Sequence, residues 1–513
     1  MQDSSEYSAT TMPLPTNTLV DSVLILLAMN VVQRLVGFVR AVLFCRWLNA
    51  EQLGMWDMAF SLLVLASPIT VLAIPGSFGR YLEHFRQRGQ MHLFLRRMIL
   101  ACGGLGILGS LALVLLRRPF AVLVFGSVEQ ANLIALAAGT LALVVAYNFM
   151  IELFTAARNI RLVSGMQLIN SAAFAVLGVA MLLTWECTAG AVLAAYAGAC
   201  LVTVAWGARP LGRLWRAVPH DAAPLPHAAM WNRIGPFAAW VLLGCILTNA
   251  FAVVDRYMIV HFSSTTASAA LDIVGNYHAS RVVPLLLISI ASMLATMSMP
   301  HLSHDWEAGR RDLVAARLRL FLKVFGVALF AAAVAVQVAG PLLFQIAFKG
   351  KFPEGQAVLP WALVFCTWFG LSLFAQNYLL CAERAGLVGA ALAAGLGLNV
   401  LLNIELLPRF GLHGAVLSTT AANALTLLMI CWFNRRHGFR LDRGAMLVLV
   451  LPVAIWFGPW ASAAALLIVC FDAAWGRILL SGEERRQLAE GAADYARRFG
   501  WDGLSRRFSR RQV

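Results

Sequence analysis

The sequence predicts an all-α membrane protein that crosses the bilayer many times. Of its 513 residues, 60% are hydrophobic and only 13% are charged, whereas about a quarter of the residues in a soluble domain carry a charge. Apolar runs of roughly 20 residues recur along almost the whole chain, and each can cross a hydrocarbon core of about 30 Å as a helix. An internal sequence repeat further predicts a helical bundle that is built twice.

Fourteen apolar runs are predicted as membrane spans, which gives two bundles of six helices and two additional C-terminal helices. The runs cover residues 18–42, 55–76, 98–116, 129–153, 166–185, 189–208, 236–260, 280–300, 318–340, 358–381, 386–406, 412–433, 444–457 and 460–479. Only Gly458 and Pro459 separate the last two.

The repeat is visible in two stretches that lie 224 residues apart. AGAVLAAYAGACL begins at Ala189 and HGAVLSTTAANAL begins at His413. Because six spans separate the copies, both halves have the same topology, and the site is expected between them. Further corresponding pairs are Pro119 and Pro341, Gly54 and Gly275, and Asn170 and Asn399.

The distribution of arginine predicts the orientation and the organisation of the chain. Arginines gather in the even-numbered connections and in the C-terminal tail, so both termini are expected in the cytoplasm. The first eighteen residues contain no Lys or Arg, so a cleaved signal peptide is not expected. The predicted parts are a cytoplasmic N-terminal segment (1–17), an N-terminal bundle (18–208), a cytoplasmic linker (209–235), a C-terminal bundle (236–433), two additional spans (444–480) and a basic amphipathic tail (481–513).

Several classes of function lack support in the sequence. None of the three lysines lies in a Walker A motif, and neither H-E-x-x-H nor G-x-S-x-G occurs. The nine cysteines show no metal-binding spacing, so no metal, no cofactor and no enzymatic activity is expected. The net charge of +15 is divided among short clusters between apolar runs, which favours membrane lipids over nucleic acid as the partner. Transport is the leading class.

Ionisable residues inside the spans are the candidate functional residues, because a charge at the centre of a span costs about 2.5–3.5 kcal/mol on insertion scales. Arginines are candidates for binding an anionic cargo, since guanidinium matches phosphate: Arg34, Arg40 and Arg281. Carboxylates are candidates for a coupling ion or a charge partner: Asp57, Glu152 and Asp255. Charges near span ends, including Arg256 and Lys323, also fit a position at the membrane interface.

Arg34 and Arg40 are expected to point in different directions. They are six positions apart, which is about 120° around an ideal helix, although Gly37 permits a bend between them. Arg34 lies roughly 22 Å along its span and is expected to face a cavity. Arg40 lies closer to the end of the span and fits either a cavity or an interfacial anchor.

Several motifs between residues 18 and 435 follow one another in the same order and spacing as in a known superfamily. They are QRLVGFVRAVLFCRWLNAEQLG (33–54), DRYMIVHF, VGNYHASRVVPLLL and MPHLS (between 255 and 303), PLLFQIAFKGKF (341–352) and LNVLLNIELLPRFGLHGAVLSTTAAN (398–423). These motifs resemble the multidrug, oligosaccharidyl-lipid and polysaccharide exporters, and the polysaccharide or O-antigen flippase branch fits best. The resemblance implies a MATE-like fold of two six-helix bundles.

The resemblance also implies a cargo and its handling. The cargo would be an oligosaccharide on undecaprenyl pyrophosphate, turned from the inner to the outer face of the bacterial inner membrane. Polysaccharide polymerase and glycosyltransferases would be functional partners. Arg34, Arg40 and Arg281 are similar to cavity arginines of the more distant lipid II flippases, and Asp57 is similar to an acidic residue there. ASPITVLAIPG in the second span lacks a further arginine of that branch, which disfavours lipid II as the cargo.

The predicted mechanism is alternating access by rocking of the two halves, driven by the membrane potential or an ion gradient. One alternative is an ion-coupled multidrug or metabolite antiporter of the same fold, which acidic residues deep in the cavity would favour. A second alternative is an integral membrane polysaccharide polymerase or ligase, which the short outward connections disfavour.

Overall fold

The computed structural model describes residues 19–218, 225–476 and 478–498. Over these ranges the chain is helical, without a strand. Within them, 12 helices are long and apolar enough to cross a membrane. The prediction of an all-α multi-pass membrane protein is confirmed. The predicted cytoplasmic segment 1–17 lies outside the described residues.

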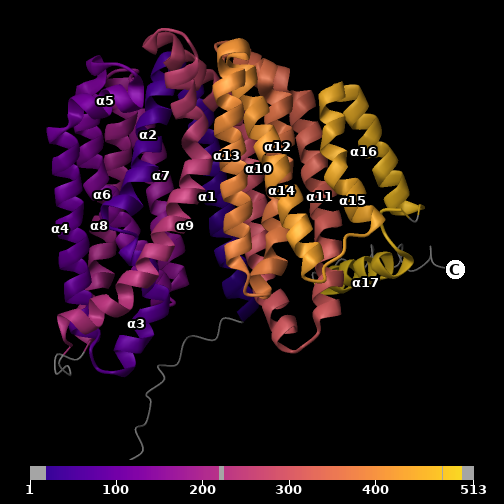
Figure 1. Ribbon diagram of the computed structural model, residues 1–513, viewed down its shortest axis with the longest axis horizontal. Coiled ribbons are helices and arrows are strands. Elements are labelled where there is room, and N and C mark those ends of the chain that lie inside the picture. The colour runs from indigo at the N-terminus through magenta and orange to yellow at the C-terminus, as the bar shows by residue number, and fades with distance from the viewer. Residues whose placement is uncertain (1–18, 219–224, 477, 499–513) are drawn as a thin grey trace, which may run out of the picture.

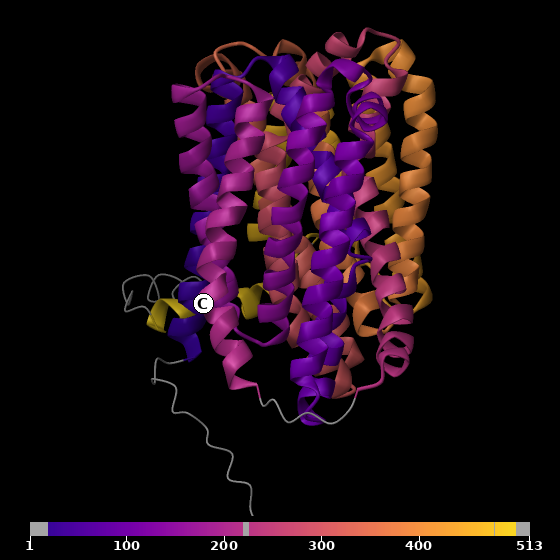
Figure 2. The same ribbon diagram turned by 90° about the vertical axis from the view of Figure 1, so that its left-hand side faces the viewer.

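The first half of the molecule contains six of these long helices and is coloured from indigo to magenta (Figure 1). Its elements are α1 (Leu19–Trp47), α2 (Ala50–Thr70), η1 (Ile74–Ser77), α3 (Phe78–Gln87), α4 (Met91–Leu115), α5 (Arg117–Phe125), η2 (Val128–Gln130), α6 (Ala131–Ala156), α7 (Ile160–Thr184) and α8 (Ala189–Ala217). Figure 2, seen from this side, shows the long helices running nearly parallel from one end of the molecule to the other.

The second half contains the other six long helices, and a C-terminal extension packs beside it. The elements of the half are α9 (His227–Phe262), α10 (Ala267–Glu307), α11 (Arg311–Leu342), η3 (Leu343–Ala347), α12 (Pro353–Cys381), α13 (Ala385–Phe410) and α14 (Leu412–Arg436). The extension comprises α15 (Arg443–Val450), η4 (Leu451–Phe457), α16 (Pro459–Ala474) and α17 (Gly482–Arg498). The last two of the fourteen predicted spans are therefore apolar helices that are shorter than the other twelve.

Helices occupy most of the predicted linker 209–235. α8 continues to Ala217 with Pro210 inside it, and α9 begins at His227, directly after Pro226. A proline at the start of a helix loses no intrahelical hydrogen bond, because the first N–H groups have no partner within the helix. The described helices therefore extend into both ends of the predicted linker.

The two halves repeat one pattern of packing. In the first half, α6 packs against α4 and α8, and α7 packs against α1 and α8. In the second half, α12 packs in the same way against α11 and α14, and α13 packs against α9 and α14. The sequence repeat therefore corresponds to a structural repeat.

The halves meet where α2 crosses α10, at the two glycines that the sequence repeat pairs. A Cβ atom on Gly54 would lie 2.0 Å from the carbonyl oxygen of Leu271, and one on Gly275 would lie 1.9 Å from that of Ala50. Each glycine thus packs against the residue four positions before the other. Only a residue without a Cβ permits this approach of the two backbones.

Side chains also join the halves at the upper end of the molecule in Figure 1, where α1 leads into α2. Lys351 of the second half donates from Nζ to the carbonyl oxygens of Arg46, Trp47 and Leu48, at 2.8, 3.2 and 3.1 Å. These carbonyls lie at the C-terminus of α1 and have no partner within the helix. Ser268 of α10 donates to Glu51 Oε1 of α2 at 2.8 Å.

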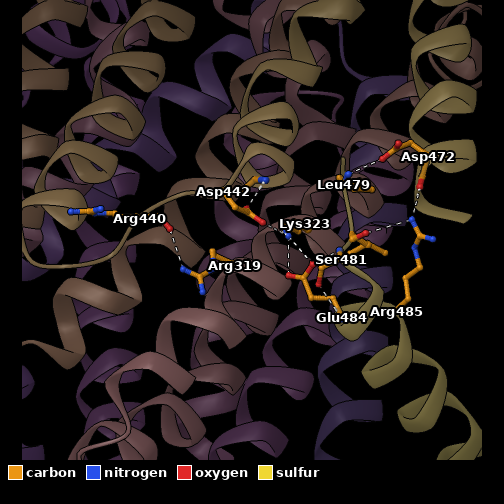
Figure 3. Close-up of polar contacts among 11 residues, drawn as sticks. Arg319, Lys323, Arg440, Asp442, Asp472, Leu479, Ser481, Glu484 and Arg485 are labelled. Carbon is orange, nitrogen blue, oxygen red and sulfur yellow. Dashed lines mark hydrogen bonds and ion pairs between the residues drawn. The ribbon is translucent and has the colours of Figure 1, made fainter. Parts of the chain in front are cut away.

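A buried lysine fixes the C-terminal extension to the second half (Figure 3). Lys323 of α11 is only 1% exposed, and its Nζ atom pairs with Asp442 and with Glu484 Oε1, the latter at 2.8 Å. Asp442 also caps the N-terminus of α15. Glu484 accepts the Ser481 N–H and Ser481 Oγ accepts the Glu484 N–H, which forms a capping box at the start of α17. The charge of Lys323 is therefore neutralised within the protein.

The predicted amphipathic tail begins with α17, which lies across the lower end of the molecule (Figure 1). Arg485 holds the turn before it by donating to the carbonyl oxygens of Asp472 and Ala474, at 3.1 and 3.4 Å. Of the predicted apolar face, Leu488 is described, whereas the side chains of Ala492, Tyr495 and Phe499 lie outside the described residues.

Candidate transport site

A cavity of about 460 Å³ lies between the two halves. We call it the interhalf cavity. α1, α2, α6, α7 and α8 of the first half and α9 and α10 of the second half all contribute to its wall. The charged and aromatic residues among those that line it are Arg34, Phe38, Arg40, Phe44, Trp56, Asp57, Phe60, Tyr147, Phe174, Tyr196, Arg256 and His278. The cavity lies where the internal repeat predicted a site.

Arg34 and Arg40 both line the interhalf cavity, although they leave α1 in different directions. α1 packs against α7 on one side and α10 on another, and the cavity extends between these neighbours. Two side chains about 120° apart on α1 therefore reach the same space. The guanidinium of Arg40 lies 4.1 Å from the ring centroid of Phe174, a cation–π contact. The buried Nε atom of Arg34 has no hydrogen-bond partner among the described residues.

Asp57 is buried at the edge of this cavity in an ion pair that spans the halves. Its Oδ2 atom lies 2.5 Å from Nε of Arg256 on α9, and its Oδ1 atom lies 3.0 Å from Nδ1 of His278 on α10. Arg256 also donates from Nη1 to Ser61 Oγ on α2 at 3.0 Å. Both members of the pair are buried, so neither extends to the interface. The lining of the cavity therefore contains three arginines, Arg34, Arg40 and Arg256, and one carboxylate, Asp57, so positive charge is in excess.

Glu152 of α6 lines a second cavity, which has a volume of about 390 Å³. Ser67, Asn148 and Asn249 also line this cavity, and Phe60 and Tyr196 line both it and the interhalf cavity. Glu152 makes no ion pair with a described residue. The two cavities adjoin, and the carboxylate of Glu152 is separate from the arginines.

Arg281 lies in a third cavity, inside the second half, and not beside Arg34 and Arg40. This cavity of about 330 Å³ is enclosed by α9, α10, α12, α13 and α14. Leu285 lines both the third cavity and the interhalf cavity. The side chain of Arg281 is buried, and its Nε and Nη1 atoms have no hydrogen-bond partner among the described residues. The cavity arginines are therefore divided between two neighbouring spaces.

Asp255 lines the third cavity as well and is surrounded by neutral donors. It is 2% exposed. Its four partners come from three helices: Asn399 and Asn403 of α13 donate to Oδ1 at 2.8 and 3.2 Å, and Tyr277 of α10 and Thr419 of α14 donate to Oδ2 at 2.8 and 2.9 Å. Asp255 makes no ion pair with a described residue. A carboxylate that is buried in a membrane span with only neutral hydrogen-bond partners is costly.

The network around Asp255 also contains an oxygen without a donor. Asn403 donates to Asn399 Oδ1 at 2.8 Å, and the buried Oδ1 atom of Asn403 itself accepts no hydrogen bond from the described residues. The hydroxyl oxygens of Tyr277 and Thr419 thus lie beside the carboxylate of Asp255, and the amide oxygens of Asn399 and Asn403 belong to the same network. Such a set of oxygens is typical of sites for hard cations.

The sequence identified the charges but not most of their partners. Arg256 was recognised as a charge within a span, yet nothing local indicates that it pairs with Asp57, almost 200 positions away. His278 and Tyr277 were not singled out. A usable signal exists for Asn399 and Asn403, because two asparagines four positions apart share one face of an apolar helix.

Two repeated six-helix halves with buried charges around a central cavity define a class, that of polytopic membrane transporters. A family model described as polysaccharide biosynthesis protein matches residues 19–305. The chain therefore belongs to this family, as its motifs predicted.

The fold is also similar to solved transporter structures. One is the lipid II flippase MurJ in an inward closed conformation, with a TM-score of 0.67 and 12% identity over 87% of this chain and 98% of that one. Another is an inward-facing multidrug resistance MATE family transporter of the MOP superfamily, with a TM-score of 0.57 and 12% identity over 80% and 97% of the two chains. At these identities the likeness establishes the fold. No curated protein matches the chain significantly.

Proposed function

We propose that this protein is a flippase for an oligosaccharide linked to a polyprenyl pyrophosphate. It moves this cargo from the cytoplasmic to the outer face of the plasma membrane, the inner membrane of a bacterium, for the synthesis of surface polysaccharide. Membership of the polysaccharide biosynthesis family supports the class of cargo. Polysaccharide polymerase and glycosyltransferases act with it as functional partners that consume and supply the cargo.

The excess of arginine in the interhalf cavity carries this proposal. Arg34 and Arg40 line a space between two bundles, and the Nε atom of Arg34 has no hydrogen-bond partner in the described part of the chain. Guanidinium groups bind phosphate oxygens by paired hydrogen bonds, and they do so more strongly in a space of low dielectric constant. The pyrophosphate binds there, with Arg281 available in the adjoining cavity, while the lipid tail stays in the bilayer.

The orientation follows from the same arginine pattern that the sequence presents. The lower end in Figure 1 carries the arginine-rich connections together with α3 and α17. This end faces the cytoplasm by the positive-inside rule. Both termini are then cytoplasmic, because α1 begins and α17 lies at this end.

Asp255 is the proposed site of the coupling ion. Its carboxylate is buried among neutral donors. The Oδ1 atom of Asn403 accepts no hydrogen bond from the described residues and is available as a ligand for a metal cation, whereas a bound proton needs no such ligand. An alkali cation would neutralise the carboxylate and take up these oxygens. Asp57 acts instead as a charge partner of Arg256, and Glu152 is available to contact the cargo in the second cavity.

The test of the function is surface polysaccharide in a strain that carries only a variant of this protein. Arg34→Ala and Arg40→Ala are expected to abolish surface polysaccharide at an unchanged protein level, because the pyrophosphate loses its counter-charge. Lipid-linked oligosaccharide should accumulate on the cytoplasmic face. Arg409→Ala is the matched control, since Arg409 is an exposed arginine paired with Glu405. Normal polysaccharide in both cavity variants would refute the proposal.

The same fold also supports a second candidate, an ion-coupled multidrug or metabolite antiporter. Glu152, facing its cavity without an ion pair, is the observation that favours it. In that case Glu152→Gln would abolish resistance to a cationic compound, whereas Arg34→Ala would leave surface polysaccharide intact. A polymerase or ligase would be indicated by lipid-linked units that accumulate on the outer face.

A further inference from the structure

We propose that Tyr277 couples the ion site at Asp255 to the anion site at Arg281. This inference rests on the proposed function, because it assigns to one residue the link between the ion and the cargo. Tyr277 lies on α10, four positions before Arg281, and its side chain is fully buried. The hydroxyl group of Tyr277 contacts Asp255, and the face of its ring contacts the guanidinium of Arg281.

The hydroxyl end of Tyr277 belongs to the network of Asp255. It donates to Asp255 Oδ2 at 2.8 Å, and Thr419 donates to the same oxygen at 2.9 Å. Tyr277 is the partner that α10 supplies to Asp255, whereas the other three partners come from α13 and α14. A cation that binds to Asp255 withdraws charge from this oxygen and thereby weakens the hydrogen bond to Tyr277.

The ring of Tyr277 holds the guanidinium of Arg281. The guanidinium carbon lies 4.8 Å from the ring centroid, within the range of a cation–π contact. Nε and Nη1 of Arg281 have no hydrogen-bond partner among the described residues, and Arg281 is 7% exposed. The orientation of the ring therefore determines where this guanidinium can present its N–H groups.

The two contacts make the binding of cation and of anion interdependent. Without a cation, the negative charge of Asp255 and the ring of Tyr277 both hold Arg281 near the ion site. With a cation bound, that attraction falls, the ring is freer to turn, and Arg281 is released to bind an anion in the third cavity. Each ligand should then increase the affinity for the other by the same factor, as linkage requires.

The experiment compares anion binding with and without Na⁺ in the purified full-length protein. Geranylgeranyl pyrophosphate is the anionic probe, and choline chloride replaces NaCl to hold the ionic strength constant. In the wild type, Na⁺ should lower the Kd of the probe by at least about fivefold, the lower end of typical coupling. In Tyr277→Phe, which retains the ring and its burial, the factor should fall below about twofold, while Na⁺ alone still raises the Tm.

Two further variants make the result specific. Tyr378→Phe is the matched control, because its hydroxyl group also bonds across the second half, to the carbonyl oxygen of His437 at 3.1 Å, but away from both sites. It should retain the wild-type factor. Arg281→Lys keeps the charge but loses the planar contact with the ring, so it should weaken the coupling as Tyr277→Phe does.

The outcomes separate this inference from the function on which it rests. Full coupling in Tyr277→Phe would overturn the role of Tyr277. Independent binding of Na⁺ and the probe to the wild type would also overturn it, and would leave ion and cargo binding intact. A wild-type protein that binds neither ligand would overturn the proposed function as well.

Discussion

At the scale of the residue, several buried charges of the described chain occur in ion pairs. Asp57 pairs with Arg256 and His278, and Lys323 pairs with two carboxylates. Removal of one member of such a pair leaves the other charge buried without compensation, which is far more costly than loss of the pair itself. The candidate cargo-binding arginines differ, because Arg34 and Arg281 line cavities and have buried N–H groups without a hydrogen-bond partner among the described residues.

This difference leads to a prediction for Asp57. Asp57→Asn should lower the free energy of unfolding by about 3–5 kcal/mol, because Arg256 loses its counter-charge in a buried place. The measurement is thermal or denaturant unfolding of the purified protein. Glu405→Gln is the control, since Glu405 pairs with Arg409 on the surface and such pairs contribute about 0–1 kcal/mol. Equal stability of Asp57→Asn and the wild type would mean that the pair contributes nothing.

At the scale of the element, the crossing of α2 and α10 is the structural feature that joins the halves. Gly54 and Gly275 permit contact between the two backbones, and the carbonyl oxygens of Ala50 and Leu271 occupy the space of the missing Cβ atoms. The sequence repeat already paired these glycines, but their mutual contact could not be predicted. A repeat shows which residues are equivalent and does not show which of them meet.

The crossing leads to a prediction for Gly275. Gly275→Ala should force α2 and α10 apart at the upper end and reduce surface polysaccharide at least tenfold at a normal protein level. The reason is that a backbone oxygen 1.9 Å from the new Cβ atom cannot move away without moving its helix. Gly139→Ala on α6 is the control, because no atom lies within 4 Å of the Cβ position there. Wild-type polysaccharide in Gly275→Ala would show that the close crossing is not required for transport.

Helix boundaries also differ from those that the sequence predicted. The sequence predicted a linker over residues 209–235, whereas α8 continues through Pro210 to Ala217 and α9 begins directly after Pro226. Local sequence signals identify where a helix is weakened. Packing against neighbouring helices decides whether it ends there.

At the scale of the whole molecule, the two halves hold opposite charges on corresponding helices. Arg34 lies on α1, which packs against α7, and Asp255 lies on α9, which packs against α13 in the same way. In the proposed function the first half thus supplies Arg34 and Arg40 to bind the pyrophosphate, and the second half supplies Arg281 and the cation site at Asp255.

Rocking of these halves predicts the effect of a cross-link at the upper end. With Glu51→Cys and Ser268→Cys in a background without the native cysteines, a short thiol-specific cross-linker should join α2 to α10 and stop transport. The wild-type side chains are hydrogen-bonded at 2.8 Å, so the two thiols can be bridged. Each single cysteine variant treated with the same reagent is the control. Transport that continues in the cross-linked protein would exclude opening at this end.

The sequence by itself determined the all-α membrane fold, the twofold repeat, the family and the charged residues of interest. These follow from hydrophobic runs, periodic motifs and the cost of charge in a bilayer, all of which are local properties of the chain. Arg34 could be assigned to a cavity from its depth within a span, because no interface is within reach of its side chain.

Only the tertiary structure decided how these charges are distributed. It brought Arg40 into the interhalf cavity with Arg34, placed Arg281 in a separate cavity with Asp255, and paired Asp57 with Arg256. These arrangements depend on the rotation and crossing of helices that lie far apart in the sequence. The physical reason is that a helix fixes the directions of its own side chains, whereas the partner that each one meets depends on how the helices pack.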